Sequence, residues 1–289
     1  MNPGSRGGKS EKKFQLIHSL LDSSNCDYDY ALTKTLDDAY DLSKQANSRD
    51  YDVIAAVGGD GTINRVLNGF YDNNGKRISS AKFGVIYTGT SPDFCKTYNI
   101  PLNTEKAVNT ILNGGTRLID VGRIEFGKNN NNSNVKYFCC CANIGLGAML
   151  AERANSGIRK IWGDTLGTFF ALMGTLMRYK QIDIKVNGES MSNVYNLSVG
   201  KTYYVASGLK IAHELNENDS RFYMLPVQER IFSKIAALYA GKPLKELRYA
   251  DEIEIIGSGR AEFDGDEGGS LPCRITNAER LEIYYEQFK

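Results

Sequence analysis

The chain has 289 residues, of which 42% are hydrophobic, 24% charged and 10% aromatic, which is the composition of an ordinary folded protein with room for about two domains. Its formal net charge of +1, with 35 basic and 34 acidic residues and no long run of one sign, argues against a nucleic-acid-binding surface. The six cysteines contain no Cys-x-x-Cys spacing, which indicates reduced core thiols rather than a zinc site or a disulfide framework.

The sequence shows neither a secretory signal nor a membrane span. No segment near the start combines a basic, an apolar and a small-residue part. The longest apolar stretch, residues 161–179, is interrupted by Asp164 and by several threonines and glycines. We therefore expect a cytoplasmic protein.

The first 121 residues alternate between helical and strand-like patterns. The predicted elements, in chain order, are a helix that Ser10 caps, a helix over 36–46 that Thr35 caps, a strand over 53–57, a helix from Ile63, a strand over 83–87 and a helix over 104–112. The two strands are short continuous apolar runs, as in a parallel sheet buried on both faces. This order predicts an α/β domain with a mostly parallel sheet.

Residues 122–289 have a different rhythm, with hydrophobic and polar residues alternating over short runs. These runs cover 117–126, 136–142, 182–186, 193–205, 221–227, 252–256, 260–263 and 281–285. Such spacing, bounded by Gly, Asn and Pro, predicts an antiparallel β-sandwich with few helices. The asparagine-rich stretch 127–134 is predicted to be a solvated hairpin loop.

The stretch Gly58-Gly59-Asp60-Gly61-Thr62 stands between a predicted strand and a predicted helix. There, backbone N–H groups and the positive end of the helix dipole would surround a small volume that suits a phosphate. The glycines would permit close backbone approach and positive φ, and Thr62 would cap the helix or bind a phosphate oxygen. Asp60 would repel a phosphate unless a cation such as Mg²⁺ lies between them. The alternative is a tight turn with a solvated aspartate.

Other motifs are incomplete. Residues 4–10 resemble a P-loop, but Pro3 stands in place of its first glycine and no strand precedes it. No complete Gly-x-Gly-x-x-Gly occurs, and with only His18 and His213 a serine-type triad has almost no support.

Several motifs together resemble one family. They are Asn2-Pro3-Gly4-Ser5, the glycine stretch 58–62, Gly89-Thr90-Ser91-Pro92-Asp93-Phe94, residues 143–147, residues 208–212, Asp219 and Phe263-Asp264-Gly265-Asp266. In this order they resemble the diacylglycerol kinase catalytic family, which includes bacterial lipid kinases and sphingosine kinases. The glycine stretch alone is shared with NAD kinases and 6-phosphofructokinases.

The resemblance implies a fold and a set of ligands. It implies an N-terminal α/β domain of the NAD kinase and 6-phosphofructokinase type, residues 1–121, and a β-sandwich domain, residues 122–289, with ATP between them. The implied nucleotide-binding residues are Asn2, Pro3, Gly4, Ser5, Arg6, Thr33, Gly58, Gly59, Asp60, Gly61, Thr62, Asn64 and Thr90. Asp60, Asp93 and Asp120 match acids that hold magnesium against the phosphates.

The resemblance also assigns two residues of the second domain. Asp266 matches a glutamate that takes the proton from the attacking hydroxyl, so Asp60 and Asp266 are the predicted catalytic residues. Without the family, residues 264–268 are simply a turn between strands. Asp219 matches a second, structural metal position, although Ser220 and His213 replace the usual glycine and proline.

Four departures from the family pattern affect the expected activity. Met1 precedes Asn2 directly, so the usual opening strand is absent, and Ser91-Pro92 replaces Gly-Asn before Asp93. Arg65 stands where an acid is usual, and Asp266 is one methylene shorter than glutamate, which can displace a reacting group by about 1 Å. These differences leave open a weak or inactive member of the family.

The acceptor side is less specific. An apolar stripe with helical spacing covers Trp162, Leu166, Phe169, Phe170, Met173, Leu176 and Met177, and a weaker stripe covers Ile231, Ile235, Leu238 and Tyr239. Both are typical of core helices and would also suit a membrane contact. We expect an ATP-dependent lipid kinase peripheral to the membrane, with a homodimer left open. The rivals are a soluble-substrate kinase and a non-catalytic nucleotide- or lipid-binding protein.

Overall fold

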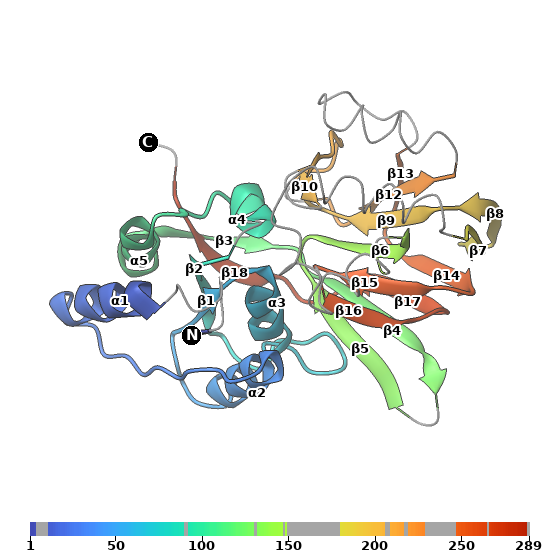
Figure 1. Cartoon of the computed structure of the whole chain (residues 1–289). Helices are drawn as coiled ribbons and strands as arrows, with labels where there is room; N and C mark the ends of the chain where they lie inside the picture. Colours follow the sequence, from blue (N-terminus) through green and yellow to red (C-terminus); the bar gives the residue numbers. More distant parts are fainter. Residues whose placement is uncertain are drawn as a thin grey trace.

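The computed structural model describes residues 1–3, 11–89, 92–129, 132–146, 148, 180–205, 209–216, 219–228, 247–264 and 266–287. It has two parts, a helix-covered sheet built mainly from the first half of the chain and a pair of antiparallel sheets built from the second half (Figure 1). The predicted fold class is confirmed. No helix within these ranges is long and apolar enough to span a membrane.

The first part contains a four-stranded sheet in the order β1-β2-β18-β3. Strands β1 (Val53–Gly58), β2 (Lys82–Tyr87) and β18 (Leu281–Tyr285) run parallel, and β3 (Gly115–Ile119) pairs antiparallel with β18. The sheet is therefore mixed and mostly parallel.

Five helices cover both faces of this sheet (Figure 1). Helices α1 (Glu11–Ser23) and α5 (Thr104–Asn113) pack on one face, where Phe14 and Ile17 join Val57, Ile86 and Val108 in one buried cluster. Helices α2 (Leu36–Asn47), α3 (Asp60–Asn68) and α4 (Asp93–Tyr98) contribute to the core on the other face. Because successive strand residues point to opposite faces, the continuous apolar runs supply both clusters.

The start of α2 follows the sequence pattern. Thr35 is its N-cap, and the Thr35 side chain and the Asp38 side chain bond each other's backbone N–H groups in a capping box. Asp37 and Asp38 lie in the first turn, near the positive end of the helix dipole. This predicted helix start is confirmed.

The last strand is a correction to the sequence-based expectation. The alternation of residues 281–285 placed them in the sandwich, but β18 lies in the first sheet, between β2 and β3. Leu281 and Ile283 are fully buried there. Alternation predicts a strand with one buried face, but it does not specify which sheet the strand joins. The division into domains 1–121 and 122–289 stays a prediction.

The second part contains two six-stranded antiparallel sheets. One has the order β13-β12-β9-β6-β15-β16, and the other β5-β4-β17-β14-β7-β8. The strands of the first sheet are β13 (Arg248–Ala250), β12 (Phe222–Val227), β9 (Asn196–Gly200), β6 (Cys141–Gly145), β15 (Arg260–Phe263) and β16 (Asp266–Ser270). Those of the second are β5 (Asn132–Phe138), β4 (Gly122–Asn129), β17 (Cys273–Asn277), β14 (Ile253–Gly257), β7 (Ile182–Val186) and β8 (Glu189–Val194).

The two sheets enclose one hydrophobic cluster, which includes Ile124, Ile144, Leu197, Phe222 and Ile255. Each sheet contributes alternate residues, as expected for a sandwich. A separate two-stranded hairpin, β10 (Tyr204–Val205) with β11 (Leu209–Lys210), contacts α4.

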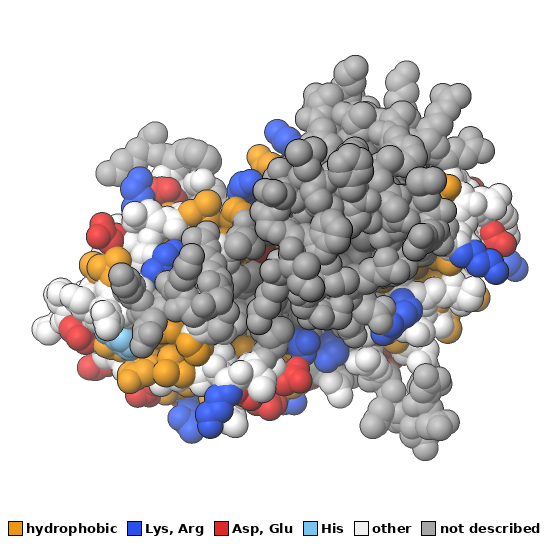
Figure 2. Space-filling view, in the orientation of Figure 1, with side chains coloured by type: hydrophobic (Ala, Val, Ile, Leu, Met, Phe, Trp, Pro, Cys, Tyr) orange, Lys and Arg blue, Asp and Glu red, His pale blue; other side chains and the backbone are white. Residues whose placement is uncertain are grey.

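Strands β4 and β5 extend further than the sequence pattern predicts. The predicted loop at 127–134 is too long, because β4 extends to Asn129 and β5 begins at Asn132. The two apolar stripes at 162–177 and 231–239 lie outside the described residues. Figure 2 shows acidic and basic side chains interspersed on one face of the molecule, in keeping with the balanced net charge.

Candidate active site

The turn between β1 and α3 is built by close contact between glycines. A Cβ on Gly58 would collide with the Thr62 side chain, and a Cβ on Gly89 would lie 2.6 Å from the Gly59 Cα. The ends of β1 and β2 therefore approach each other at a distance that only glycine allows. The expected positive φ is wrong, because none of Gly58, Gly59 and Gly61 has a left-handed backbone conformation.

The N-terminus of α3 has no side-chain cap. Gly59 is its N-cap residue and supplies no side-chain hydrogen bond. Thr62, one of the predicted caps, instead accepts a hydrogen bond of 2.9 Å at Oγ1 from the Asn2 amide. A Cβ on Gly61 would meet no atom of the described residues within 4 Å, so among those residues the helix start is open at this position. This arrangement suits an anion, because the helix dipole and its first N–H groups point outward.

The start of the chain lies against the same turn. The backbone N–H of Asn2 donates to the Val57 carbonyl at 3.0 Å, and the N–H of Thr33 donates to the Met1 carbonyl, also at 3.0 Å. These bonds bring Asn2 and Thr33, two predicted nucleotide-binding residues, next to the end of β1. Pro3 follows directly.

Asp60 is the most electrostatically perturbed residue of the turn. Its Oδ2 accepts from the Tyr87 hydroxyl at 3.2 Å, whereas its Oδ1 is buried with no hydrogen-bond partner in the described parts of the chain. Burial, with the negative charge of Asp93 as the next cause, raises the pKa of Asp60 to about 7. Asp93 is the first residue of α4, so two strand ends supply the two acids.

A divalent cation fits the Asp60–Asp93 pair. A hard cation prefers oxygen ligands, and it would offset the burial and the negative charge of Asp93 that raise the pKa of Asp60. The buried Oδ1 of Asp60 would gain a partner. Oxygen ligands and an adjacent anion site are what a magnesium-bound nucleotide requires.

Asp264 connects the second part of the chain to α3. Its carboxylate accepts hydrogen bonds from the backbone N–H groups of Cys139, Cys140 and Cys141, at 2.8 to 3.0 Å, and from the Asn64 amide at 3.1 Å. Burial raises the pKa of Asp264, although the three N–H groups oppose that shift. Sequence analysis did not predict this anchoring role of Asp264, because the sequence shows only a turn there. The three N–H groups that donate to Asp264 belong to residues more than a hundred positions away.

The hydrogen bond between Asn64 and Asp264 also helps to position the backbone of Asp266. It is the first residue of β16 and pairs across the hairpin with Phe263 of β15, directly before Asp264. Asn64, a predicted nucleotide-binding residue, therefore anchors through Asp264 the hairpin that carries the predicted base. The Asp266 side chain lies outside the description, so its proton-accepting role stays a prediction.

Asp120 and Asp219 have different surroundings from Asp60. Asp120 lies 3.1 Å from the Lys201 ammonium and 3.1 Å from the Arg280 guanidinium. Both carboxylate oxygens of Asp219 accept from the Arg221 guanidinium, which lowers the pKa of Asp219 to about 2. Each acid is thus neutralised by side chains of this chain, and neither fits a metal as well as Asp60 does.

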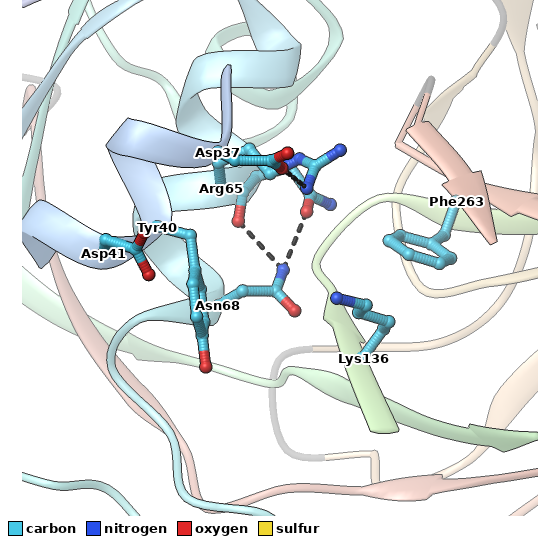
Figure 3. Close-up of a pocket in the computed structure, with 8 residues that line it drawn as sticks. Asp37, Tyr40, Asp41, Arg65, Asn68, Lys136 and Phe263 are labelled. Carbon is cyan, nitrogen blue, oxygen red and sulfur yellow. Dashed lines mark hydrogen bonds and ion pairs between the residues drawn. The ribbon is translucent and has the colours of Figure 1, made fainter. Parts of the chain in front are cut away.

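A pocket of about 250 Å³ lies between α2 and α3 on one side and β5 and β15 on the other. Its lining residues are Asp37, Tyr40, Asp41, Asn64, Arg65, Asn68, Lys136 and Phe263. Figure 3 shows Lys136 and Phe263 across the pocket from the two helices. The Arg65 guanidinium, which stands where the family has an acid, donates to Asp37 at 2.6 Å.

Asn64, Arg65 and Asn68 share one face of α3 with Gly61, because residues three and four apart are helix neighbours. The pocket therefore lies along α3, beyond its first turn. Five predicted residues lack side-chain descriptions or lie outside the described ranges: Gly4, Ser5, Arg6, Thr90 and Asp266.

Comparisons with known proteins bear on this site. Residues 1–124 match the family model of the diacylglycerol kinase catalytic domain. A diacylglycerol kinase of Staphylococcus aureus is 26% identical over 96% of this chain and 88% of that relative. The predicted resemblance is confirmed.

Solved structures show the same fold. A diacylglycerol kinase of Bacillus anthracis str. Sterne aligns with a TM-score of 0.70 at 19% identity, over 98% of this chain and 94% of that one. Yeast NADH kinase, solved with NADH, aligns with a TM-score of 0.58 at 11% identity, over 96% of this chain and 79% of that one.

Proposed function

Because the first 124 residues match the diacylglycerol kinase catalytic family, whose kinases use ATP, we propose that this chain transfers the γ-phosphoryl group of ATP to a lipid hydroxyl. The observation that best supports the proposal is Asp60, a buried acid with one unpartnered oxygen among the described residues, at the uncapped start of α3. Such an acid is unfavourable without a cation and useful beside a metal-bound phosphate.

The proposed role of each site residue follows from its position in the fold. The first turn of α3 and the glycines at 58–61 bind the phosphates, and Asn2, Thr33 and Asn64 orient the nucleotide around them. Asp60 and Asp93 would hold a magnesium ion, which supplies charge stabilisation to the transferring group. Phosphoryl transfer requires positioning and electrostatics more than covalent chemistry, and rigid backbone turns provide both.

We assign to Asp266 the role of the base that removes the proton from the lipid hydroxyl. A carboxylate at the start of β16 would accept the proton of the attacking hydroxyl. The Asn64–Asp264 hydrogen bond supports this role, because it holds the β15–β16 hairpin against the helix that binds the phosphates. A lipid acceptor would come from a membrane surface, and the apolar stripe around Phe169 and Phe170 is the proposed contact.

The test is transfer of radiolabel from [γ-³²P]ATP, with magnesium, to a panel of diacylglycerol, a sphingoid base, a prenol and a whole-lipid extract. We expect one lipid class to be labelled by the wild type, and labelling to fall by about 10²-fold or more in Asp60→Asn and in Asp266→Asn. Asp266→Glu restores the family's usual residue and should retain activity. Asp50→Asn, at an exposed residue after α2, is the matched control.

Two outcomes would replace the proposal. Labelling of soluble alcohols or nucleotides, without any lipid, would favour the soluble-substrate kinase. ATP binding without transfer to any acceptor would favour a non-catalytic binding protein, for which Pro92, Arg65 and Asp266 are the motivating residues. Vesicle co-sedimentation that is unchanged by Phe169→Asp would contradict the proposed membrane contact.

A further inference from the structure

The Lys201 ammonium lies in a cage of oxygen atoms. It donates to the Asp120 carboxylate at 3.1 Å, to the Asp219 carbonyl at 3.1 Å and to the Ser220 carbonyl at 2.9 Å. An ammonium has three N–H donors, so the cage satisfies all of them. The ring of Phe222 lies 4.6 Å from the same nitrogen, and only 9% of the Lys201 side chain is exposed.

Close packing of the preceding strand fixes the position of the Lys201 backbone. Lys201 directly follows Gly200, the last residue of β9. A Cβ on Gly200 would lie 2.6 Å from the Cys140 carbonyl and 2.7 Å from the Tyr223 hydroxyl, so the strand runs too close to its neighbours for any side chain at this position. Lys201 is therefore held at a defined place rather than on a free surface loop.

The three oxygens come from segments that are far apart in the sequence. Asp120 lies at the step from β3, in the first sheet, to β4, in the second part of the chain. Asp219 and Ser220 precede β12, and the Ser220 carbonyl also accepts from the Asn277 amide at 2.7 Å. The ammonium thus bridges the exit of the first sheet and the sandwich.

One carboxylate and two carbonyl oxygens are also the ligands that a hard metal ion prefers. The resemblance places a structural metal at Asp219, yet the Asp219 carboxylate accepts hydrogen bonds from Nε of Arg221 at 2.9 Å and from Nη2 at 2.7 Å. The chain's own cations therefore occupy both acids of this region.

We infer that Lys201 is a built-in cation, which holds Asp120 and the carbonyls of Asp219 and Ser220 together as a bound metal would, so that this chain binds no divalent ion there. The inference does not depend on the proposed kinase activity, and its test measures stability and metal binding alone. It is an alternative to the expectation that Asp219 binds a metal, which stays a prediction, and it makes Lys201 a positioning residue for Asp120.

The test compares Lys201→Ala, which empties the cage, with Lys201→Met, which fills it without charge. Thermal unfolding is followed without nucleotide, with EDTA, magnesium or calcium, in the whole chain carrying Asp60→Asn as well, so that the Asp60–Asp93 pair contributes little. We expect both variants to lose about 5 °C or more in EDTA, because a partly buried acid loses its partner. Magnesium or calcium should restore Lys201→Ala but not Lys201→Met.

A direct metal measurement accompanies the melting experiment and serves if a variant does not fold. Terbium luminescence on the Asp60→Asn protein should show no site that depends on Asp219 while Lys201 is present. The inference is overturned if this protein binds terbium at a site that Asp219→Asn abolishes, or if Lys201→Ala melts at the same temperature as its parent. Loss of stability that neither magnesium nor calcium reverses would overturn the claim that the ammonium takes the place of a metal.

Discussion

Asp60 and Asp93 lie at the ends of two parallel strands, whereas Asp120 and Asp219 lie around Lys201, beside the sandwich. The two pairs of acids differ in their electrostatic surroundings. At the first pair, burial and the negative charge of Asp93 raise the pKa of Asp60 to about 7. At the second, Lys201, Arg280 and Arg221 lie within hydrogen-bond distance of the carboxylates. The same residue type, predicted for the same task, thus has opposite electrostatic settings.

A bound metal adds most stability where the charge of an acid is not already balanced by a nearby cation. A divalent ion beside Asp60 would offset the burial and the like charge that raise the pKa of Asp60, whereas at Asp120 and Asp219 it would have to displace an existing cation. Burial without a partner makes an acid a candidate ligand, and an internal ion pair removes that reason. The predictions below test this contrast.

The largest effect is expected at Asp60. Asp60→Asn keeps the size of the side chain but removes the charge that would hold the cation, so phosphoryl transfer should fall by about 10³-fold. Initial-rate kinetics measure the loss, and circular dichroism checks that the fold is kept. A variant with near wild-type kcat would show that the metal is held elsewhere.

The next largest effect is on stability at Asp264. Asp264→Ala leaves the backbone N–H groups of Cys139, Cys140 and Cys141 without their acceptor, at about 1 kcal/mol or more each. The melting temperature should fall by about 6 °C or more. Asp264→Asn keeps one acceptor oxygen and should lose less. A change of under about 2 °C in Asp264→Ala would contradict the anchoring role.

A smaller effect is a pH dependence that comes from Asp60. Because its folded pKa lies above the unfolded value of 3.8, the native state binds the extra proton between pH 3.8 and about 7, and stability falls as the pH rises through that window. Asp60→Asn should remove this part of the slope and be the more stable protein at pH 8. The comparison is made by thermal unfolding without nucleotide. Parallel pH curves for the two proteins would count against the raised pKa.

The smallest effect is expected at Asp37. Its side chain is 80% exposed, and its ion pair with Arg65 is screened by water. Asp37→Asn should change the free energy of unfolding by less than about 0.5 kcal/mol, as measured in urea. A loss above about 1 kcal/mol would mean that the pair braces α2 against α3 more strongly than an exposed ion pair does.

Local patterns predicted much of the fold. The capping box at Thr35, the buried runs of β1 and β2 and the glycine turn before α3 are encoded within a few neighbouring residues. The partner of a strand is not encoded in this way. Residues 281–285 read as a sandwich strand, but they return across the whole chain to the first sheet.

In the candidate site, too, only the features encoded by neighbouring residues could be predicted. The glycines and Asp60 stand out in the sequence because turn chemistry is local. Asp264 and Lys201 do not, since their partners, the N–H groups at 139–141 and the oxygens at 120, 219 and 220, come together only after folding. The one signal that the sequence offered was the Asp-Gly turn, in which Asp264 adopts a positive φ of 50°.

The most direct test of the contrast is calorimetric titration of ATP, with and without magnesium, into the wild type, Asp60→Asn and Asp219→Asn. The account predicts that magnesium strengthens ATP binding to the wild type and to Asp219→Asn alike, and that Asp60→Asn loses this gain. If Asp219→Asn lost the gain while Asp60→Asn kept it, the metal would lie with the second pair of acids, and the account would be wrong.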